Sequence, residues 1–236
     1  MKPVNRRFLI TFFAITVAYP FGVSAQWNKK PYTEWSEKEA TKLLNDSPWG
    51  QTQAVTDTSQ MTGVARADSG QSRIADVFNV NLRIRFLSAK PVRQAISRLM
   101  EIKNAEKISP QLATRLKEFA AADFPDYIVI TVTTESEKAS ALFQQTQAAF
   151  YKLTTNEMIN NTYLLASGQR VFVKEYQPPG KDGLGARYIF PRLVDGKPFV
   201  NPETVDVLFH SEPRGTTVLN MRYKVKDMMF DGKLEY

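Results

Sequence analysis

The strictest alternation in the chain lies in the stretch Phe78-Asn79-Val80-Asn81-Leu82-Arg83-Ile84-Arg85-Phe86. Apolar residues occupy every second position throughout it, and polar or basic residues fill the positions between them. Because successive side chains of a strand point to opposite faces, this pattern predicts a β-strand with one buried and one solvated face. Arg83 and Arg85 would lie on the solvated face, where they could bind an anionic ligand or glycan or form a hydrated basic surface.

Residue patterns that predict helices occur both before and after this strand in the sequence. The segment Ser36-Glu37-Lys38-Glu39 fits a capping box, in which the Ser36 hydroxyl accepts from the Glu39 amide and the Glu39 side chain reaches back. Pro91 and Ser109-Pro110 each begin a further apolar stripe with helical spacing, and another such stripe covers residues 135–153. Tryptophans bracket the first helix and are expected to pack it onto the core: Trp27, Trp35 and Trp49.

The remaining apolar segments predict strands. Residues 51–56 are expected to be a short strand, and residues 127–133 a strand covered on both faces, because they lack clean alternation. Turn residues at Ser167-Gly168-Gln169-Arg170 and Asp195-Gly196 indicate hairpins in the C-terminal third. The connections there are too short for crossovers, so antiparallel pairing is expected. The expected strands of this third are residues 163–166, 171–176, 187–190, 197–200, 205–209, 218–225 and one within 228–236.

Together these elements predict an α+β fold. We expect a mainly antiparallel sheet, three or four packed helices on one side, and a β-rich C-terminal third over residues 160–236. Residues 26–236 are expected to form a single domain, because they are numerous enough to bury a core. Residues 57–76 are rich in Ser, Thr, Gly, Gln and Ala and show no apolar period, which predicts a mobile loop.

The N-terminus has the features of an export signal. Basic residues at Lys2, Arg6 and Arg7 precede an uncharged apolar run over residues 8–18, and Val23-Ser24-Ala25 supplies the small residues of a cleavage site. The apolar run is too short to span a bilayer, which needs about 20 residues. We therefore expect cleavage after Ala25 and a secreted or periplasmic product without a stable membrane span. The alternative is an uncleaved anchor.

Composition excludes several classes of chemistry. The chain has no cysteine, so the exported form has no disulfides, no thiol catalysis, no thiolate metal site and no lipid attachment at an N-terminal Cys. The formal charge of +7 falls to about +4 when Lys2, Arg6 and Arg7 leave with the signal. The remaining basic residues are scattered, which argues against a nucleic-acid partner.

The residues suited to catalysis do not form a known motif. His210 is the only histidine, so a histidine cluster for zinc cannot form, and a Ser-His-Asp triad would have to use His210 with neighbours such as Ser211 and Glu212. Neighbours in sequence rarely face one another correctly, so a surface histidine at a strand end is the preferred interpretation. The sequence also contains no Gly-x-Ser-x-Gly elbow.

The acidic pairs and the glycine-rich segment also do not indicate a catalytic or binding site. Asp123 with Asp126, and Glu203 with Asp206, are close in sequence, but their positions in a connection and at a strand entry are typical of solvated turns. The glycine-rich segment 180–185 lacks the Walker pattern and is expected to be a loop. The sequence therefore predicts no catalytic, metal-binding or cofactor-binding residue, and no cofactor.

Three segments resemble exported hypothetical proteins of Acidobacteria. They are Trp35-Ser36-Glu37-Lys38-Glu39 with Leu43-Leu44-Asn45-Asp46-Ser47-Pro48-Trp49, then Arg85-Phe86-Leu87-Ser88-Ala89-Lys90-Pro91-Val92-Arg93, and the ending Lys226-Asp227-Met228-Met229-Phe230-Asp231-Gly232-Lys233-Leu234-Glu235-Tyr236. The resemblance implies a bacterial exported protein of about this size. It implies no activity and no functional residues.

Two functional hypotheses follow from these observations. The first is a non-enzymatic exported protein that binds an envelope protein or polymer. It is favoured because the sequence predicts many strands with exposed basic residues and contains few groups suited to catalysis. The second is a hydrolase that acts on envelope or extracellular polymer. A cleft with two carboxylates of displaced pKa would favour the hydrolase, and an exposed apolar patch or open sheet edge would favour the binding protein.

Overall fold

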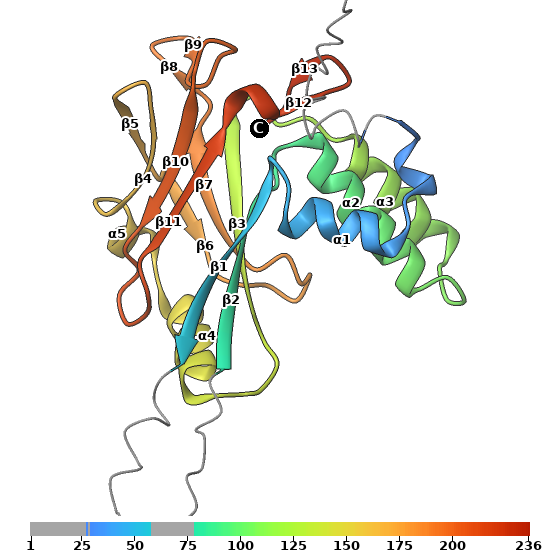
Figure 1. Cartoon of the computed structure of the whole chain (residues 1–236), viewed down its shortest axis with the longest axis horizontal. Helices are drawn as coiled ribbons and strands as arrows, with labels where there is room; N and C mark the ends of the chain where they lie inside the picture. The colour runs from blue at the N-terminus through green and yellow to red at the C-terminus, as the bar shows by residue number, and fades with distance from the viewer. Residues whose placement is uncertain (1–26, 28, 58–77) are drawn as a thin grey trace, which may run out of the picture.

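The computed structural model describes Trp27 and residues 29–57 and 78–236. In this part of the chain two antiparallel sheets pack face to face, with helices at one side and at one end (Figure 1). The described residues thus form an α+β fold with antiparallel sheets, about four substantial helices and a β-rich C-terminal region, which confirms the predicted fold class. The predicted signal peptide over residues 1–25 and the predicted loop, except Asp57 at the end of a strand, lie outside the described residues.

Sheet A is built around the strand that the alternating stretch predicts. Within the described residues it has five strands. In spatial order they are β1 (Gly50–Asp57), β2 (Phe78–Phe86), β3 (Tyr127–Ser136), β7 (Ala186–Pro191) and β6 (Glu175–Gln177). On β2, the side chains of Leu82, Ile84 and Phe86 are fully buried, as the alternation predicts.

Sheet B has four strands in the described part of the chain. In spatial order they are β11 (Leu219–Lys224), β10 (Asp206–Ser211), β4 (Thr162–Ala166) and β5 (Gln169–Phe172). The ring of Tyr223 on β11 lies edge-on against Phe86, with 4.8 Å between ring centroids, and its hydroxyl donates to the Ile84 carbonyl at 2.9 Å. Burial raises the pKa of Tyr223, so the phenol stays neutral and remains a donor. This contact fixes sheet B against β2.

Two turns form as their residues predict, but the strands around them pair differently. Ser167 and Gly168 both have positive φ, 48° and 79°, which suits a two-residue hairpin turn, and β5 begins directly at Gln169. The expected strand over residues 171–176 was wrong as a single element, because β5 ends at Phe172 and Glu175 begins β6 in the other sheet. Asp195-Gly196 joins the short strands β8 (Leu193–Val194) and β9 (Lys197–Pro198).

The helices before β3 form one group beside sheet A (Figure 1). They are η2 (Tyr32–Glu34), α1 (Glu37–Asn45), α2 (Lys90–Lys103) and α3 (Pro110–Ala121). Trp27, Trp35 and Trp49 are all buried, which confirms that they pack this group onto the core. Within the described residues no helix is both long and apolar enough to cross a membrane.

Another helical segment closes an end of the sandwich. It contains α4 (Ala141–Lys152) and α5 (Thr155–Met158), and Phe150, Leu153 and Met158 belong to the core. The helix predicted from residue 135 was wrong at its start, because Glu135 and Ser136 still pair with Asn81 and Val80 of β2. The Ser140 hydroxyl then caps the helix by accepting from the Phe143 amide.

The last residues fasten the helical group to the sheets. The chain ends with η4 (Val225–Asp227), β12 (Met229–Phe230) and β13 (Lys233–Leu234). The Glu235 carbonyl accepts from the Trp49 indole at 2.8 Å, and its carboxylate accepts from the Lys90 amide at the start of α2 at 2.9 Å. Glu235 therefore ties the N-terminus of α2 to the loop after α1.

Arg93 is buried where α2, the end of β2 and the connection after α3 meet. Its side chain is 1% exposed, and its guanidinium donates to the carbonyls of Leu87, Ser88 and Ala122 and lies 5.0 Å from the Phe124 ring centroid. Burial lowers the pKa of Arg93. Because two buried carbonyls and one partly buried carbonyl accept from this side chain, it links the end of β2 to the connection after α3.

We predict that Arg93→Met lowers the free energy of unfolding by about 3 kcal/mol, because it leaves buried carbonyls without donors. Denaturant unfolding of the wild type and the variant measures this difference. Arg115→Met is the matched control, since Arg115 is exposed on α3. Equal losses in the two variants would contradict the role assigned to Arg93.

The predicted capping box is present at the start of α1. The Ser36 hydroxyl accepts from the Glu39 amide at 3.3 Å, and the Glu39 carboxylate accepts from the Ser36 amide at 2.8 Å. These bonds to Ser36, together with Lys30, lower the pKa of Glu39 from 4.5 to about 2. A carboxylate whose pKa is lowered by folding stabilises the fold above its ordinary pKa and loses that effect as pH falls toward the folded value.

We therefore predict that Glu39→Gln makes the free energy of unfolding less dependent on pH between about pH 4.5 and pH 2. Thermal midpoints of wild type and variant across this range would measure the effect, with the wild type losing more stability on acidification. Glu37→Gln removes the same charge from the same helical turn without breaking the capping box. The prediction fails if both variants follow the same pH profile.

Candidate functional site

The structure separates His210 from Ser211, its neighbour in the triad that the sequence suggested. His210 lies on the outer face of β10, and its ring nitrogens contact Asn220 Oδ1 at 2.7 Å and Glu212 Oε1 at 3.0 Å. Ser211 is buried on the opposite face, where its hydroxyl contacts the Thr162 hydroxyl at 2.9 Å. His210 cannot activate Ser211 because the two side chains point to opposite faces of the strand.

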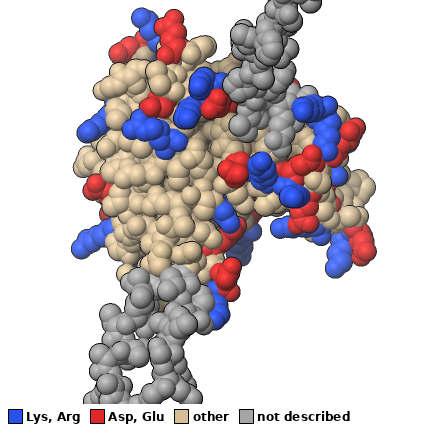
Figure 2. All heavy atoms as spheres, in the orientation of Figure 1, with Lys and Arg blue, Asp and Glu red and all other residues tan. Residues whose placement is uncertain are grey.

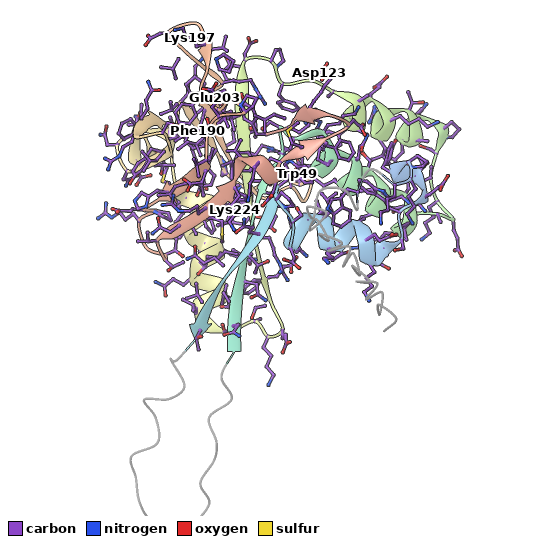
Figure 3. All side chains as sticks on the ribbon, turned by 45° about the horizontal axis from the view of Figure 1, so that its top comes forward. Trp49, Asp123, Phe190, Lys197, Glu203 and Lys224 are labelled. Carbon is purple, nitrogen blue, oxygen red and sulfur yellow. The ribbon has the colours of Figure 1, made fainter. Side chains whose placement is uncertain are left out.

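The structure places the two acidic pairs in different surroundings: Asp123 and Asp126 lie in a connection, and Glu203 and Asp206 lie beside basic side chains in one hollow. Asp123 and Asp126 are exposed in the connection between α3 and β3, and Glu203 is exposed in the turn before β10. Figure 3 shows Asp123 on the helical side of the molecule and Glu203 on the other side, below the hairpin that carries Lys197. Asp206 binds the Arg222 guanidinium at 2.6 Å. The structure therefore assigns these acids to turns and to an ion pair.

Arg83 and Arg85 are half-buried and bind other parts of the chain. Arg85 donates to the Leu44 carbonyl at 2.9 Å and to the Asn45 side chain at 2.7 Å, at the C-terminus of α1. Burial lowers the pKa of Arg85 to about 10, so it remains charged at neutral pH, where a cation near a helix C-terminus is favourable. Arg83 donates to Thr52 and Glu135. The predicted solvated basic face was therefore wrong for Arg85.

Among the described residues, the sandwich leaves the outer face of sheet B uncovered by helices. In Figure 1 no helix of the described chain lies across β10 and β11. The strand register places side chains in rows across this face. One row is Phe172, Tyr163, His210 and Asn220, and the next is Arg170, Leu165, Leu208 and Arg222. We call these two rows the sheet B face.

The part of the sheet B face on β4 carries more apolar side chains than strict alternation would place there. An antiparallel sheet with one wet face normally alternates apolar and polar residues. On β4, however, Leu164 points inward and both Tyr163 and Leu165 point outward and are only partly buried. Phe172 at the edge is 44% exposed. Figure 2 shows a broad area without charged side chains on this side of the molecule, although Arg222 and Lys224 on β11 are exposed.

Aromatic contacts organise the first row of this face. Tyr163 stacks on His210 with 4.7 Å between ring centroids and meets Phe172 edge-on at 5.8 Å. The Arg170 guanidinium lies 4.5 Å from the centroid of the Tyr163 ring. These contacts hold the side chains of this row in fixed positions.

The edges of the two sheets meet along a seam between β1 and β11. Gln51 and Gln53 occupy inward positions opposite Ile84 and Leu82, where an apolar side chain would be usual. Gln53 donates to the Val218 carbonyl at 2.8 Å and accepts from the Asn220 amide at 3.0 Å. Gln51 donates to the Arg222 carbonyl at 3.1 Å. The two glutamines therefore satisfy backbone groups that an edge strand leaves unpaired.

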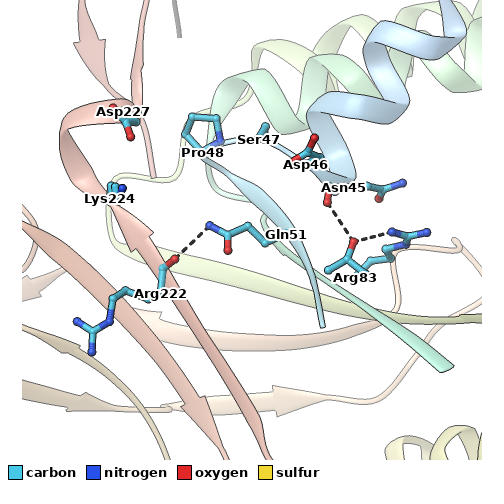
Figure 4. Close-up of a pocket in the computed structure, with 10 residues that line it drawn as sticks. Asn45, Asp46, Ser47, Pro48, Gln51, Arg83, Arg222, Lys224 and Asp227 are labelled. Carbon is cyan, nitrogen blue, oxygen red and sulfur yellow. Dashed lines mark hydrogen bonds between the residues drawn. The ribbon is translucent and has the colours of Figure 1, made fainter. Parts of the chain in front are cut away.

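An open polar cleft of about 730 Å³ lies at the upper part of this seam (Figure 4). It runs between the loop after α1, which contributes Asp46, and the end of β11, which contributes Arg222 and Lys224. Arg83 and Asp227 also line it. The cleft thus carries three basic and two acidic side chains, so its charge is close to balanced.

A second hollow, of about 620 Å³, lies beside the cleft and shares Arg222 and Lys224 with it. Its lining includes Pro202 and Val205, and Val205 is 78% exposed. Lys226 stands at its rim. Among the described residues, no group of three or more His, Asp or Glu side chains is placed to hold a metal ion.

No protein-family model matches the chain, and no curated protein or solved structure matches it significantly. Function must therefore be inferred from the surfaces of the chain itself.

The sequence contained part of the signal for these surfaces. In the predicted strand over residues 218–225, apolar Leu219, Met221 and Tyr223 alternate with Asn220, Arg222 and Lys224, and Arg222 and Lys224 are exposed. The uninterrupted apolar run Tyr163-Leu164-Leu165 was a sign that β4 has apolar residues on both faces. The hollow at Val205 was not predictable from the sequence. It forms between a turn and a strand that come together only in the folded chain.

We predict that Gln53→Ala lowers the free energy of unfolding by about 1–2 kcal/mol, because it removes two hydrogen bonds to the edge of β11. The same variant should increase self-association, since it exposes an unpaired strand edge. Denaturant unfolding and sedimentation velocity measure the two effects. Gln169→Ala, at an exposed position on β5, is the control and should change neither.

Proposed function

We propose that this chain is a non-enzymatic exported protein of the bacterial cell envelope whose partner protein docks on the sheet B face. The observation that carries the proposal is the apolar character of outward positions on an uncovered sheet. Leu165 and Leu208 lie side by side at its centre, and Phe172 extends the patch to the edge. Contiguous apolar surface of this kind is typical of interaction sites.

Charge indicates what kind of partner fits. The apolar centre is flanked by Arg170 on β5 and Arg222 on β11. The acidic side chains near the face already have partners, since Asp206 binds Arg222 and Glu212 contacts His210. The face therefore suits a partner surface that presents apolar side chains flanked by carboxylates, with Arg170 as the stronger contact because it has no carboxylate of its own in the described structure.

The hydrolase hypothesis has less support from the described residues. The acids in the cleft at the seam are Asp46, after α1, and Asp227, in η4 (Figure 4). Glycoside hydrolysis needs one protonated and one ionised carboxyl group held in different environments. The carboxyl group with a strongly lowered pKa, Glu39, lies in the helix cap, away from this cleft. The binding hypothesis therefore accounts for more of the observed surface.

We predict that a displayed library of random peptides, selected on the full chain, enriches sequences that combine apolar residues with Asp or Glu. The double variant Leu165→Lys, Leu208→Lys should weaken the binding of enriched peptides by about tenfold or more, because it places two ammonium groups in the apolar centre. Arg170→Glu should weaken the binding of the peptides richest in Asp or Glu most strongly. Binding is measured by fluorescence polarisation with synthetic copies of the clones.

The control is Met100→Lys, which adds a lysine at another exposed apolar position, on α2. Circular dichroism establishes that each variant is folded. Failure to enrich any sequence, or equal binding to wild type and to the double variant, would overturn the proposed docking face.

A further inference from the structure

The hollow beside the end of β11 combines an apolar floor with a basic rim. Pro202 and Val205 provide apolar surface, and the aliphatic parts of the basic side chains extend it. Val205 is 78% exposed, which is the highest exposure among the large apolar side chains of the described residues. A volume of about 620 Å³ lies within the range of small-ligand sites.

Backbone hydrogen bonds hold this floor in place. The Val225 amide donates to the Val205 carbonyl at 3.1 Å, which fastens the segment before β10 to the end of β11. The Asn201 side-chain oxygen accepts from the amides of Glu203 and Thr204 at 2.9 and 3.1 Å, so the turn that carries Pro202 is also fixed. The exposed Val205 side chain is therefore presented by a rigid backbone.

The hollow is lined by more basic than acidic side chains. Arg222, Lys224 and Lys226 face two acids, Glu203 and Asp206. Asp206 binds Arg222, which leaves the two lysines against Glu203. No ion pair or hydrogen bond of the described structure engages the Lys224 or Lys226 ammonium group.

We infer that this hollow binds an apolar group that carries a terminal carboxylate. The apolar part would lie on Val205 and Pro202, and the carboxylate would accept hydrogen bonds from the Lys224 and Lys226 ammonium groups. The C-terminal residue of a polypeptide and a fatty acid share this chemistry. Arg222 lines both this hollow and the proposed docking face, but the floor of the hollow and both lysines lie outside the two rows of that face.

The inference is tested by probes that differ only in the carboxylate. Decapeptides ending in Leu, Val or Phe are compared with their C-terminal amides, and decanoate with decanol, by isothermal titration calorimetry. We expect the acids to bind with dissociation constants on the order of 100 µM and the amides and decanol to bind about tenfold more weakly. Binding of the peptides would identify a polypeptide C-terminus as the source, and binding of decanoate alone would identify a free amphiphile.

Variants then locate the site. The double variant Lys224→Gln, Lys226→Gln should remove the difference between acid and amide, and Val205→Asp should weaken both. Lys117→Gln with Lys152→Gln, which neutralises two exposed lysines on α3 and α4, should leave binding unchanged. The docking-face variant Leu165→Lys, Leu208→Lys should also bind the acids normally, so failure of one site does not imply failure of the other. Equal binding of acids and amides to the wild type, or binding of neither, would overturn the inference.

Discussion

The position of Tyr223 determines how the two sheets lie on each other. Its ring packs against Phe86 and its hydroxyl binds the Ile84 carbonyl, so a side chain of β11 is anchored in the middle of β2. Because side chains alternate along a strand, an inward Tyr223 forces Arg222 and Lys224 outward. The same anchor sets β11 beside β1, where Gln51 and Gln53 bind its free backbone groups. The seam, the cleft and the hollow all include residues of β11, the strand that this contact anchors.

The elements that could be predicted from the sequence are those whose formation depends on neighbouring residues. The alternation over residues 78–86 and the Ser36–Glu39 capping box depend on neighbours in sequence, and the structure contains both. The division of residues 171–176 between two sheets was not predictable, since it depends on Lys174 pairing its amide with the Ile189 carbonyl of sheet A. The start of α4 was misplaced for the same reason, because distant β2 residues hold Glu135 in a strand.

The roles of charged residues depend still more on the tertiary structure. The sequence shows Arg83 and Arg85 as a matched pair on a wet strand face, and cannot show that α1 ends above Arg85. The sequence shows Arg93 as one more basic residue in an amphipathic helix, yet its guanidinium donates to two carbonyls just before the helix and to the distant Ala122 carbonyl. Because the chain has no cysteine, disulfides cannot link these segments, and hydrogen bonds from buried donors and at Glu235 and Tyr236 link them instead.

The two proposed surfaces meet at Arg222. Its guanidinium ends the second row of the sheet B face and also lines the hollow, while Asp206 holds it at 2.6 Å. A ligand carboxylate that draws Arg222 into the hollow would take it from the docking face and leave Asp206 without its partner. Any coupling between the two sites must be reciprocal, because each ligand changes the affinity for the other by the same factor. Since the Arg222–Asp206 pair is largely exposed, that factor should be small, and each surface can act on its own.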